Sequence, residues 1–178
     1  MTWVIDTSHT TVEFAVRHLG LANVKGTFHR LSGEAEVNET DLTKSRGRVE
    51  IEVGSVDTRE EKRDAHLRSA DFFDAENYPT ITFESRTIRE RSGLRYEVDG
   101  DLTIHGVTRP VTVDVELSEF IDDPWGNRRA AVSVSGEINR KDFGLTYGTA
   151  VEAGRLVVGD KVKVQAEAEL VQVAAVAA

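Results

Sequence analysis

The sequence predicts an all-β fold of eight antiparallel strands in one domain spanning residues 1–178. Two observations lead to this prediction. Apolar and polar residues alternate along most of the chain, and only one segment has the composition of a helix. Alternation with a period of two is typical of a strand with one buried and one solvated face. A chain of 178 residues also has the length of one ordinary domain with a single core.

Alternation in the first half of the chain predicts four strands, around residues 12–16, 24–37, 49–53 and 81–83. The second of these has an irregularity, because its apolar phase shifts between Phe28 and Leu31. A regular strand would then turn residues to the wrong face. We therefore expect a bulge or bend at this point.

One helix is predicted to interrupt the strands. Residues Thr58-Arg59-Glu60-Glu61 match a capping box, and residues 60–70 contain no Gly, Pro or β-branched residue. The helix should run over about residues 59–69. Its faces are mostly charged, and Phe72 and Phe73 follow its end. This aromatic pair is expected to anchor the helix to the sheet.

Alternation is strongest in the second half. Residues 96–104 and 107–117 flank a turn at His105-Gly106, which predicts a long β-hairpin. Two further half-buried antiparallel strands are predicted around residues 132–138 and 162–170.

Alternation is absent between these last two strands, over residues 141–160. The segment contains Gly144, Gly148, Gly154 and Gly159, and it is predicted to form a long loop. Glycines permit the backbone changes that opening requires, so we expect this loop to act as a gate.

Eight strands with one apolar face can hide that face between two packed sheets or inside a closed barrel. The alternation leaves both arrangements open. The inward phase does contain small residues, namely Gly33, Ala35, Gly100, Gly136, Ala166 and Ala168. An eight-stranded barrel is either filled by side chains or holds one ligand, and small inward residues favour a ligand. We therefore expect an elongated apolar cavity.

Composition disfavours several classes of function. A net charge of −9 repels nucleic acids and anionic membranes. The absence of cysteine removes disulfides, thiolate nucleophiles and Cys-ligated zinc. No H-E-x-x-H spacing occurs, so no metal or cofactor is expected. The start of the chain has no basic and apolar leader, which predicts a soluble cytoplasmic protein, or an exported one if a leader has been trimmed.

Four motifs, in order along the chain, resemble those of the YceI-like, polyisoprenoid-binding family. The first two are Trp3-x-x-Asp6-x-x-His9-x-x-Val12-x-Phe14-x-Val16-x-His18-Leu19-Gly20 with Gly26-x-Phe28, and Phe72-Phe73-Asp74 with Tyr78-Pro79, Phe83 and Ser85. The others are Gly100-x-Leu102-Thr103-Ile104-His105-Gly106-Val107-Thr108 and Arg140-x-Asp142-Phe143-Gly144. The resemblance covers nearly the whole chain.

This resemblance implies a lipocalin-like, elongated eight-stranded barrel around a tunnel for a long-chain lipid, such as a polyprenyl phosphate, a quinone or a fatty-acid derivative. It also implies a homodimer and a non-enzymatic carrier or sequestering role. The residues expected to line the tunnel are Phe14, Val16, Phe28, Ile51, Phe72, Phe73, Phe83, Leu102, Ile104, Val113, Val132, Val134, Phe143, Val164, Ala166 and Ala168.

Four residues are candidates for contact with a lipid headgroup. Arg140 is preferred, because a guanidinium binds phosphate bidentately and this residue stands at the start of the long loop. Tyr147 adds a hydroxyl nearby. His9 and His18 lie in family-like motifs at strand ends, where a histidine often only bonds the backbone. His66, on the charged helix, is expected to be a surface residue.

Two other readings remain. One is an enzyme that uses a His/Asp pair at the barrel mouth, such as His9 with Asp6, as a general acid and base on a lipid or quinone. An acyl-transfer triad built on Ser8 is disfavoured, because no G-x-S-x-G sequence is present. The other reading is a β-sandwich without a cavity that acts only as an interaction module.

Overall fold

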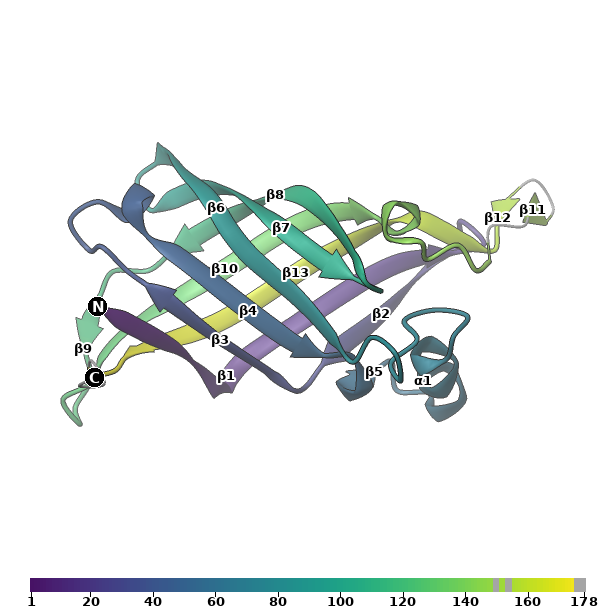
Figure 1. The fold of residues 1–178 in the computed structure, drawn as a ribbon, viewed down its shortest axis with the longest axis horizontal. Helices are drawn as coiled ribbons and strands as arrows, with labels where there is room; N and C mark the ends of the chain where they lie inside the picture. Colours follow the sequence, from purple (N-terminus) through teal and green to yellow (C-terminus); the bar gives the residue numbers. More distant parts are fainter. Residues whose placement is uncertain (149–150, 153–154, 175–178) are drawn as a thin grey trace.

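The computed structural model describes residues 1–148, 151–152 and 155–174 and consists mainly of long antiparallel strands (Figure 1). The strands are β1 (Thr2–His18), β2 (Ala22–Phe28), β3 (Leu31–Glu36), β4 (Arg46–Glu52), β5 (Val56–Asp57), β6 (Thr80–Ser92), β7 (Arg95–Ile104), β8 (Val107–Leu117), β9 (Ile121–Asp122), β10 (Arg128–Asn139), β11 (Val151–Glu152), β12 (Arg155–Leu156) and β13 (Val158–Gln172). The helical segments are α1 (Glu61–Arg68) and the 3-10 helices η1 (Leu42–Lys44), η2 (Val53–Ser55) and η3 (Arg140–Phe143).

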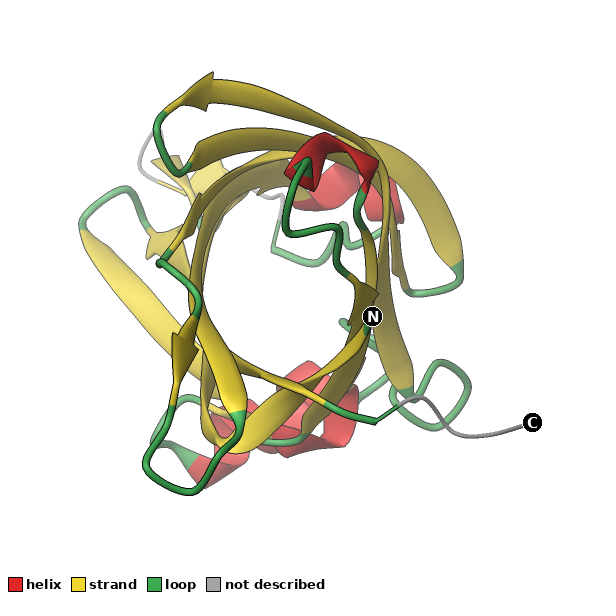
Figure 2. Ribbon diagram, turned by 90° about the vertical axis from the view of Figure 1, so that its left-hand side faces the viewer, coloured by secondary structure: helices red, strands yellow, loops and turns green. Residues whose placement is uncertain are grey.

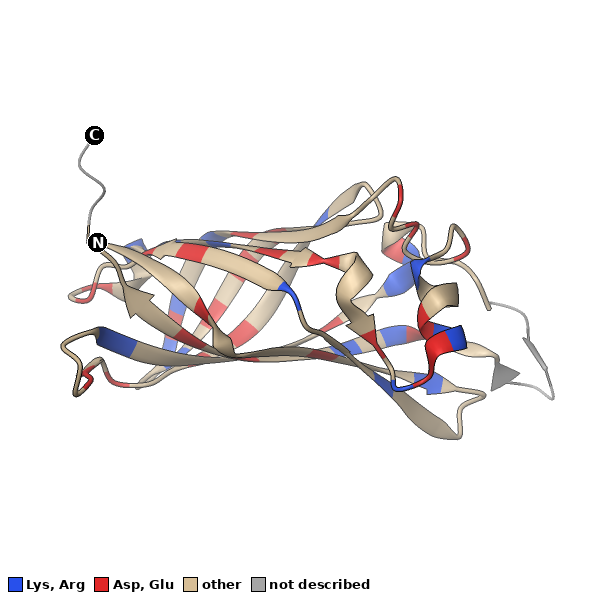
Figure 3. Cartoon of the chain, turned by 90° about the horizontal axis from the view of Figure 1, so that it is seen from below, with Lys and Arg blue, Asp and Glu red and all other residues tan. Residues whose placement is uncertain are grey.

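Eight strands close into a barrel. Their order around it is β1-β3-β4-β6-β7-β8-β10-β13, and β13 pairs back with β1. Seen from one end, the strands form a continuous ring (Figure 2). The predicted all-β fold and the barrel are therefore confirmed, and the two-sheet sandwich is wrong. Charged residues occur along the strands and at both ends of the barrel (Figure 3).

The irregularity predicted between Phe28 and Leu31 is present. The second predicted strand divides there into β2 and β3, and both parts pair with β1. β2 runs beside residues Val12–His18 and β3 beside Thr2–Val4. The break lets one stretch of chain change direction while its apolar residues stay on the inner face.

A second irregularity lies in β1 and was not predicted. Asp6 pairs with Glu169 and Thr11 with Glu167, so residues 7–10 bulge out of the ladder. Asp6 holds this bulge, because its carboxylate accepts a hydrogen bond from the Ser8 amide at 3.1 Å and its carbonyl accepts one from Thr10 Oγ1 at 2.7 Å. The bulge reverses the apolar phase, which is why alternation predicted a strand only from residue 12.

The helix α1 is confirmed, but it begins later than the capping box predicts. Glu60 is the N-cap, and its carboxylate accepts bonds from the amides of Lys62 and Arg63. Thr58 is instead bound to Asp64, whose Oδ1 accepts from the Thr58 amide at 2.8 Å. No helix of the described ranges is long and apolar enough to cross a membrane.

The turn between β7 and β8 is confirmed at His105-Gly106. Both residues have positive φ, 54° and 71°, as a two-residue hairpin turn with the strand twist requires. The long loop predicted over residues 141–160 is only partly a loop, because it contains the end of η3, the β11–β12 ribbon and the start of β13. Residues 149–150 and 153–154, including Gly154, lie outside the described residues.

The hydrophobic core gathers at the α1 end of the barrel. β8 pairs with β10 only over residues 132–135 of β10, so the two strands are not paired toward the α1 end, where η3 lies against β8. Phe143 of η3 is 1% exposed and belongs to the core cluster with Phe28, Val53 and Leu145. The 3-10 helices η2 and η3 and the residues after η3 therefore close this end of the barrel.

Candidate functional site

A cavity of about 160 Å³ lies inside the α1 end of the barrel, and its accessible surface is entirely apolar. Phe14 and Val16 of β1 contribute to it, as do Leu102 of β7 and Val164 of β13. These side chains come from strands far apart in sequence, because the barrel closes through β1 and β13. The site is therefore suited to an uncharged apolar group.

Many of the residues predicted to line a tunnel do line this cavity. Those that line it are Phe14, Val16, Phe28, Ile51, Phe72, Phe73, Leu102, Ile104 and Val164. Leu145 and Val158 also line the cavity and are not among the predicted tunnel residues. Both lie within the long loop predicted over residues 141–160, where no periodicity could reveal an inward side chain.

The other predicted tunnel residues lie outside this cavity. They are Phe83, Val113, Val132, Val134, Phe143, Ala166 and Ala168. Phe143 is packed in the core instead. Val132 pairs with Ala168 and Val134 with Ala166, so these four share the same phase along the middle of the barrel.

Several side chains of inward phase beyond the α1 end are not fully buried. Val134, Val164, Ala166 and Ala168 are only half-buried, although they have the inward phase of a closed barrel. This pattern is typical of a barrel whose interior is incompletely filled.

The glycines of inward phase do not leave open space beside them, contrary to what their small size predicts. A Cβ on Gly33 would overlap Ile5 Cδ1, a Cβ on Gly100 would overlap Phe83 Cζ, and a Cβ on Gly136 would lie 3.0 Å from Val113 Cγ1. A neighbouring side chain therefore covers each of these glycines. These glycines therefore let larger side chains lie along the barrel wall.

Arg140 is one of the residues that line the cavity, and its guanidinium binds the backbone. It donates to the carbonyls of Gly159 at 2.8 Å, Leu145 at 2.8 Å, Tyr147 at 2.6 Å and Val158 at 3.0 Å. The side chain is buried, and burial lowers the pKa of the guanidinium. Arg140 thus fastens the segment after η3 to the start of β13, which no sequence motif indicated.

Three aromatic rings meet beside the cavity. Tyr147 lies 4.8 Å from the His66 ring and 4.9 Å from the Phe72 ring, and His66 lies 5.1 Å from Phe72. Phe72 lines the cavity, whereas Tyr147 is 45% exposed. This aromatic cluster connects α1 to the long loop. We call this cluster of His66, Phe72 and Tyr147 the rim. His66, expected to be a surface residue, is therefore part of it.

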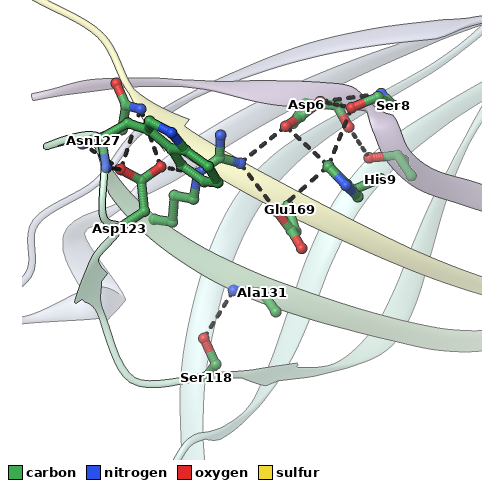
Figure 4. Close-up of polar contacts among 11 residues, drawn as sticks. Asp6, Ser8, His9, Ser118, Asp123, Asn127, Ala131 and Glu169 are labelled. Carbon is green, nitrogen blue, oxygen red and sulfur yellow. Dashed lines mark hydrogen bonds and ion pairs between the residues drawn. The ribbon is translucent and has the colours of Figure 1, made fainter.

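The His9/Asp6 pair does not lie at the cavity. His9 belongs to the β1 bulge and Asp6 immediately precedes it (Figure 4), and neither residue lines the cavity. His18, at the end of β1, is exposed and does not line it either. The His9/Asp6 pair is therefore separate from this cavity.

The chemistry of this pair also disfavours catalysis. His9 Nδ1 lies 3.1 Å from both Asp6 Oδ2 and Ser8 Oγ, so one ring nitrogen serves both partners and no relay through the imidazole is formed. Hydrogen bonds from Ser8, Arg129 and His9 hold the pKa of Asp6 well below its usual range. Such a carboxylate is a poor proton carrier near neutral pH.

Asp6, His9 and Glu169 lie close enough to share a metal ion, since their ligand atoms are within 4.8 Å of one another. Arg129 already occupies the space between the two carboxylates. Its Nη1 donates to Asp6 Oδ2 at 2.9 Å and to Glu169 Oε2 at 3.0 Å. The cluster is therefore a set of ion pairs that joins β1, β10 and β13.

Comparison with curated proteins finds relatives over most of the chain. The UPF0312 protein of Serratia proteamaculans is 42% identical over 152 residues, which cover 84% of this chain and 79% of that protein. The UPF0312 protein of Staphylococcus aureus is 35% identical over 168 residues, which cover 94% of this chain and 95% of that one.

Solved structures share the barrel. BcnA of Burkholderia cenocepacia superposes with a TM-score of 0.82 at 23% identity, covering 93% of this chain and 98% of that one. The YceI protein of Campylobacter jejuni gives 0.76 at 27% identity, covering 89% and 90%. A polyisoprenoid binding domain from Saccharophagus degradans gives 0.72 at 19% identity, covering 96% and 98%, a likeness of fold alone. The sequence profile of the YceI-like domain matches residues 3–170, and the chain therefore belongs to the YceI-like family.

Proposed function

We propose that this protein binds a long apolar chain of the isoprenoid type inside the barrel and carries or sequesters it unchanged. The observation that carries the proposal is the wholly apolar cavity inside a closed barrel. Burial of apolar chain would supply affinity, at about 0.8 kcal/mol for each CH₂ removed from water. The fold is also that of the polyisoprenoid binding domain from Saccharophagus degradans.

The size of the cavity places a condition on this proposal. A volume of about 160 Å³ is close to that of a cavity that holds benzene, and well below the ~300 Å³ of small ligand pockets. A long chain must therefore extend from the cavity into the half-buried middle of the barrel. Val134, Ala166 and Ala168 would contact that extension.

The polar end of the ligand is proposed to lie at the rim rather than in the cavity. The cavity surface offers no polar atom, and four N–H groups of Arg140 are bound to carbonyls. We propose that the hydroxyl of Tyr147, on an exposed side chain next to Phe72, contacts the headgroup. A neutral or weakly polar head, such as an alcohol, phenol or quinone, fits this arrangement better than a phosphate.

Solvent extraction of the purified protein, followed by mass spectrometry, tests the proposal. We expect a neutral or weakly polar isoprenoid or other long-chain lipid at a near-equimolar ratio to protein. Protein stripped of lipid should then bind an added isoprenoid alcohol with the same stoichiometry. Gentle purification that repeatedly yields no lipid, together with failure of the stripped protein to bind the alcohol, would reject the carrier function.

A further inference from the structure

Gly26 is small for reasons of space rather than backbone conformation. It lies in β2 directly opposite Phe14 of β1, and its φ is not in the left-handed region that favours glycine. A Cβ at this position would overlap Phe14 Cζ and stand 2.5 Å from Cε1 and 3.1 Å from Cε2. The tip of the Phe14 ring therefore occupies the place that the side chain of residue 26 would take.

The ring of Phe14 is bounded by β2 and by the ring of Phe28, and it faces the cavity. Phe14 lines the cavity, and its ring lies 5.5 Å from that of Phe28, which in turn lies 5.9 Å from Phe73. The wall of β2 is behind it, and the Phe28 ring is beside it. A methyl group on residue 26 would push the Phe14 ring into the cavity.

We propose that the Phe14–Gly26 pair sets the width of the cavity and thereby admits chains that carry methyl branches. The inference rests on the proposed binding function and names the feature of the ligand that is selected. An unbranched chain is narrower by its missing methyl groups. In a cavity of about 160 Å³, displacement of one ring removes space that a branch requires while a linear chain still passes.

Gly26 is the position at which this idea is tested most cleanly. The three atoms closest to its added Cβ all belong to the Phe14 side chain, which can turn. At Gly100, by contrast, an added Cβ would lie 2.6 Å from the carbonyl oxygen of Glu84, so a substitution there would disturb the backbone. Gly47 supplies the control, because its Cβ would make ordinary contacts of 3.6 Å with Ala35 Cβ and Glu34 O.

The experiment measures binding of two alcohols with the same head and backbone length, hexadecanol and its methyl-branched counterpart phytanol. They are titrated into lipid-stripped wild type, Gly26→Ala and Gly47→Ala. We expect Gly26→Ala to weaken phytanol binding about tenfold relative to hexadecanol, since hydrophobic pockets discriminate a single methylene by roughly 10–200-fold. Gly47→Ala should leave the ratio at its wild-type value.

A double variant separates a narrowed cavity from a damaged fold. Replacing Phe14 with Leu in the Gly26→Ala protein shortens the displaced side chain and should restore phytanol binding. The inference is overturned if Gly26→Ala leaves the ratio of phytanol to hexadecanol affinity unchanged, or if Phe14→Leu does not restore the lost phytanol binding. In either case the proposed binding function still stands, provided that the wild type binds the alcohols. Wild type that binds neither alcohol removes the proposed function itself.

Discussion

The guanidinium of Arg140 donates a 2.6 Å hydrogen bond to the carbonyl of Tyr147, and so a buried cation fixes the residue that carries the exposed ring at the cavity rim. The same side chain binds the carbonyls of Leu145, Val158 and Gly159. Within the described residues no carboxylate forms an ion pair with it. Its charge is therefore stabilised by peptide dipoles together with a Coulomb interaction from Asp160, and both the start of β13 and the segment after η3 are held by it.

Replacement of Arg140 by Gln should destabilise the protein by about 3 kcal/mol, because buried carbonyls lose a charged donor and bonds of this kind contribute ~1.5–3 kcal/mol each without adding fully. Urea denaturation measures the loss. The control is Lys141→Gln, which removes a partly exposed pair with Asp160 and should cost at most about 0.5 kcal/mol. Equal costs for the two variants would contradict the role given to Arg140.

Replacement of Ala166 or Ala168 by Phe tests whether the middle of the barrel is hollow. Overpacking a filled core costs about 1–3 kcal/mol, whereas a ring placed in an open interior should leave stability nearly unchanged. We expect the variants to keep their melting temperature and to lose bound lipid. Gln165→Phe, on the exposed phase of β13, should change neither property. A large loss of stability at Ala166, with no lipid to lose, would mean that the interior is packed.

The barrel could be predicted because its signal is local. Alternation marks each strand in a short window, and even the break after Phe28 appears as a shift of phase. The bulge in β1 also shifts the buried phase, since Trp3 is fully buried in one phase and Val12 in the other. The sequence does not reveal this shift, because the residues before the bulge do not alternate. The start of α1 was misplaced because Asp64 binds Thr58, a contact that a capping-box pattern does not contain.

The candidate site was predicted only in part, because its details depend on which strands lie beside each other. The apolar phase identified Phe14 and Leu102 as cavity residues. It could not show that a ring lies over Gly26 or Gly100, since that depends on register between strands. Nor could it show that Arg140 binds four carbonyls of a segment without periodicity. Non-local geometry decides these features.

Asp6 is expected to make the stability of the barrel depend on pH. Its pKa in the folded protein is well below the usual value, so its stabilising effect is fully present above the unfolded pKa of about 3.9. The effect is lost progressively as the pH falls from there toward the lower pKa of the folded protein. Asp6→Asn should therefore lower the free energy of unfolding at about pH 7, by roughly 1–2 kcal/mol, and by less at about pH 3. Urea titrations at both pH values measure this.

The control for Asp6 is Asp122→Asn. Asp122 pairs with Arg128 through a largely exposed carboxylate, so its loss should have little effect at either pH. A deficit in Asp6→Asn that stays constant from neutral to acidic pH would show that the carboxylate charge is not what stabilises the bulge.

Tyr147 offers a test of how the rim works, because its ring and its hydroxyl have separable effects. The ring contacts His66 and Phe72, and aromatic pairs contribute about 0.5–1.5 kcal/mol each. Tyr147→Ala should therefore speed release of a bound isoprenoid alcohol by about tenfold, as measured by stopped-flow displacement, and should raise hydrogen exchange over residues 144–148. Tyr147→Phe keeps the ring, so its release rate should match wild type if the cluster closes the cavity by packing. Faster release from Tyr147→Phe would assign the effect to the hydroxyl as a headgroup contact, and a wild-type rate in Tyr147→Ala would remove the closing role from the cluster.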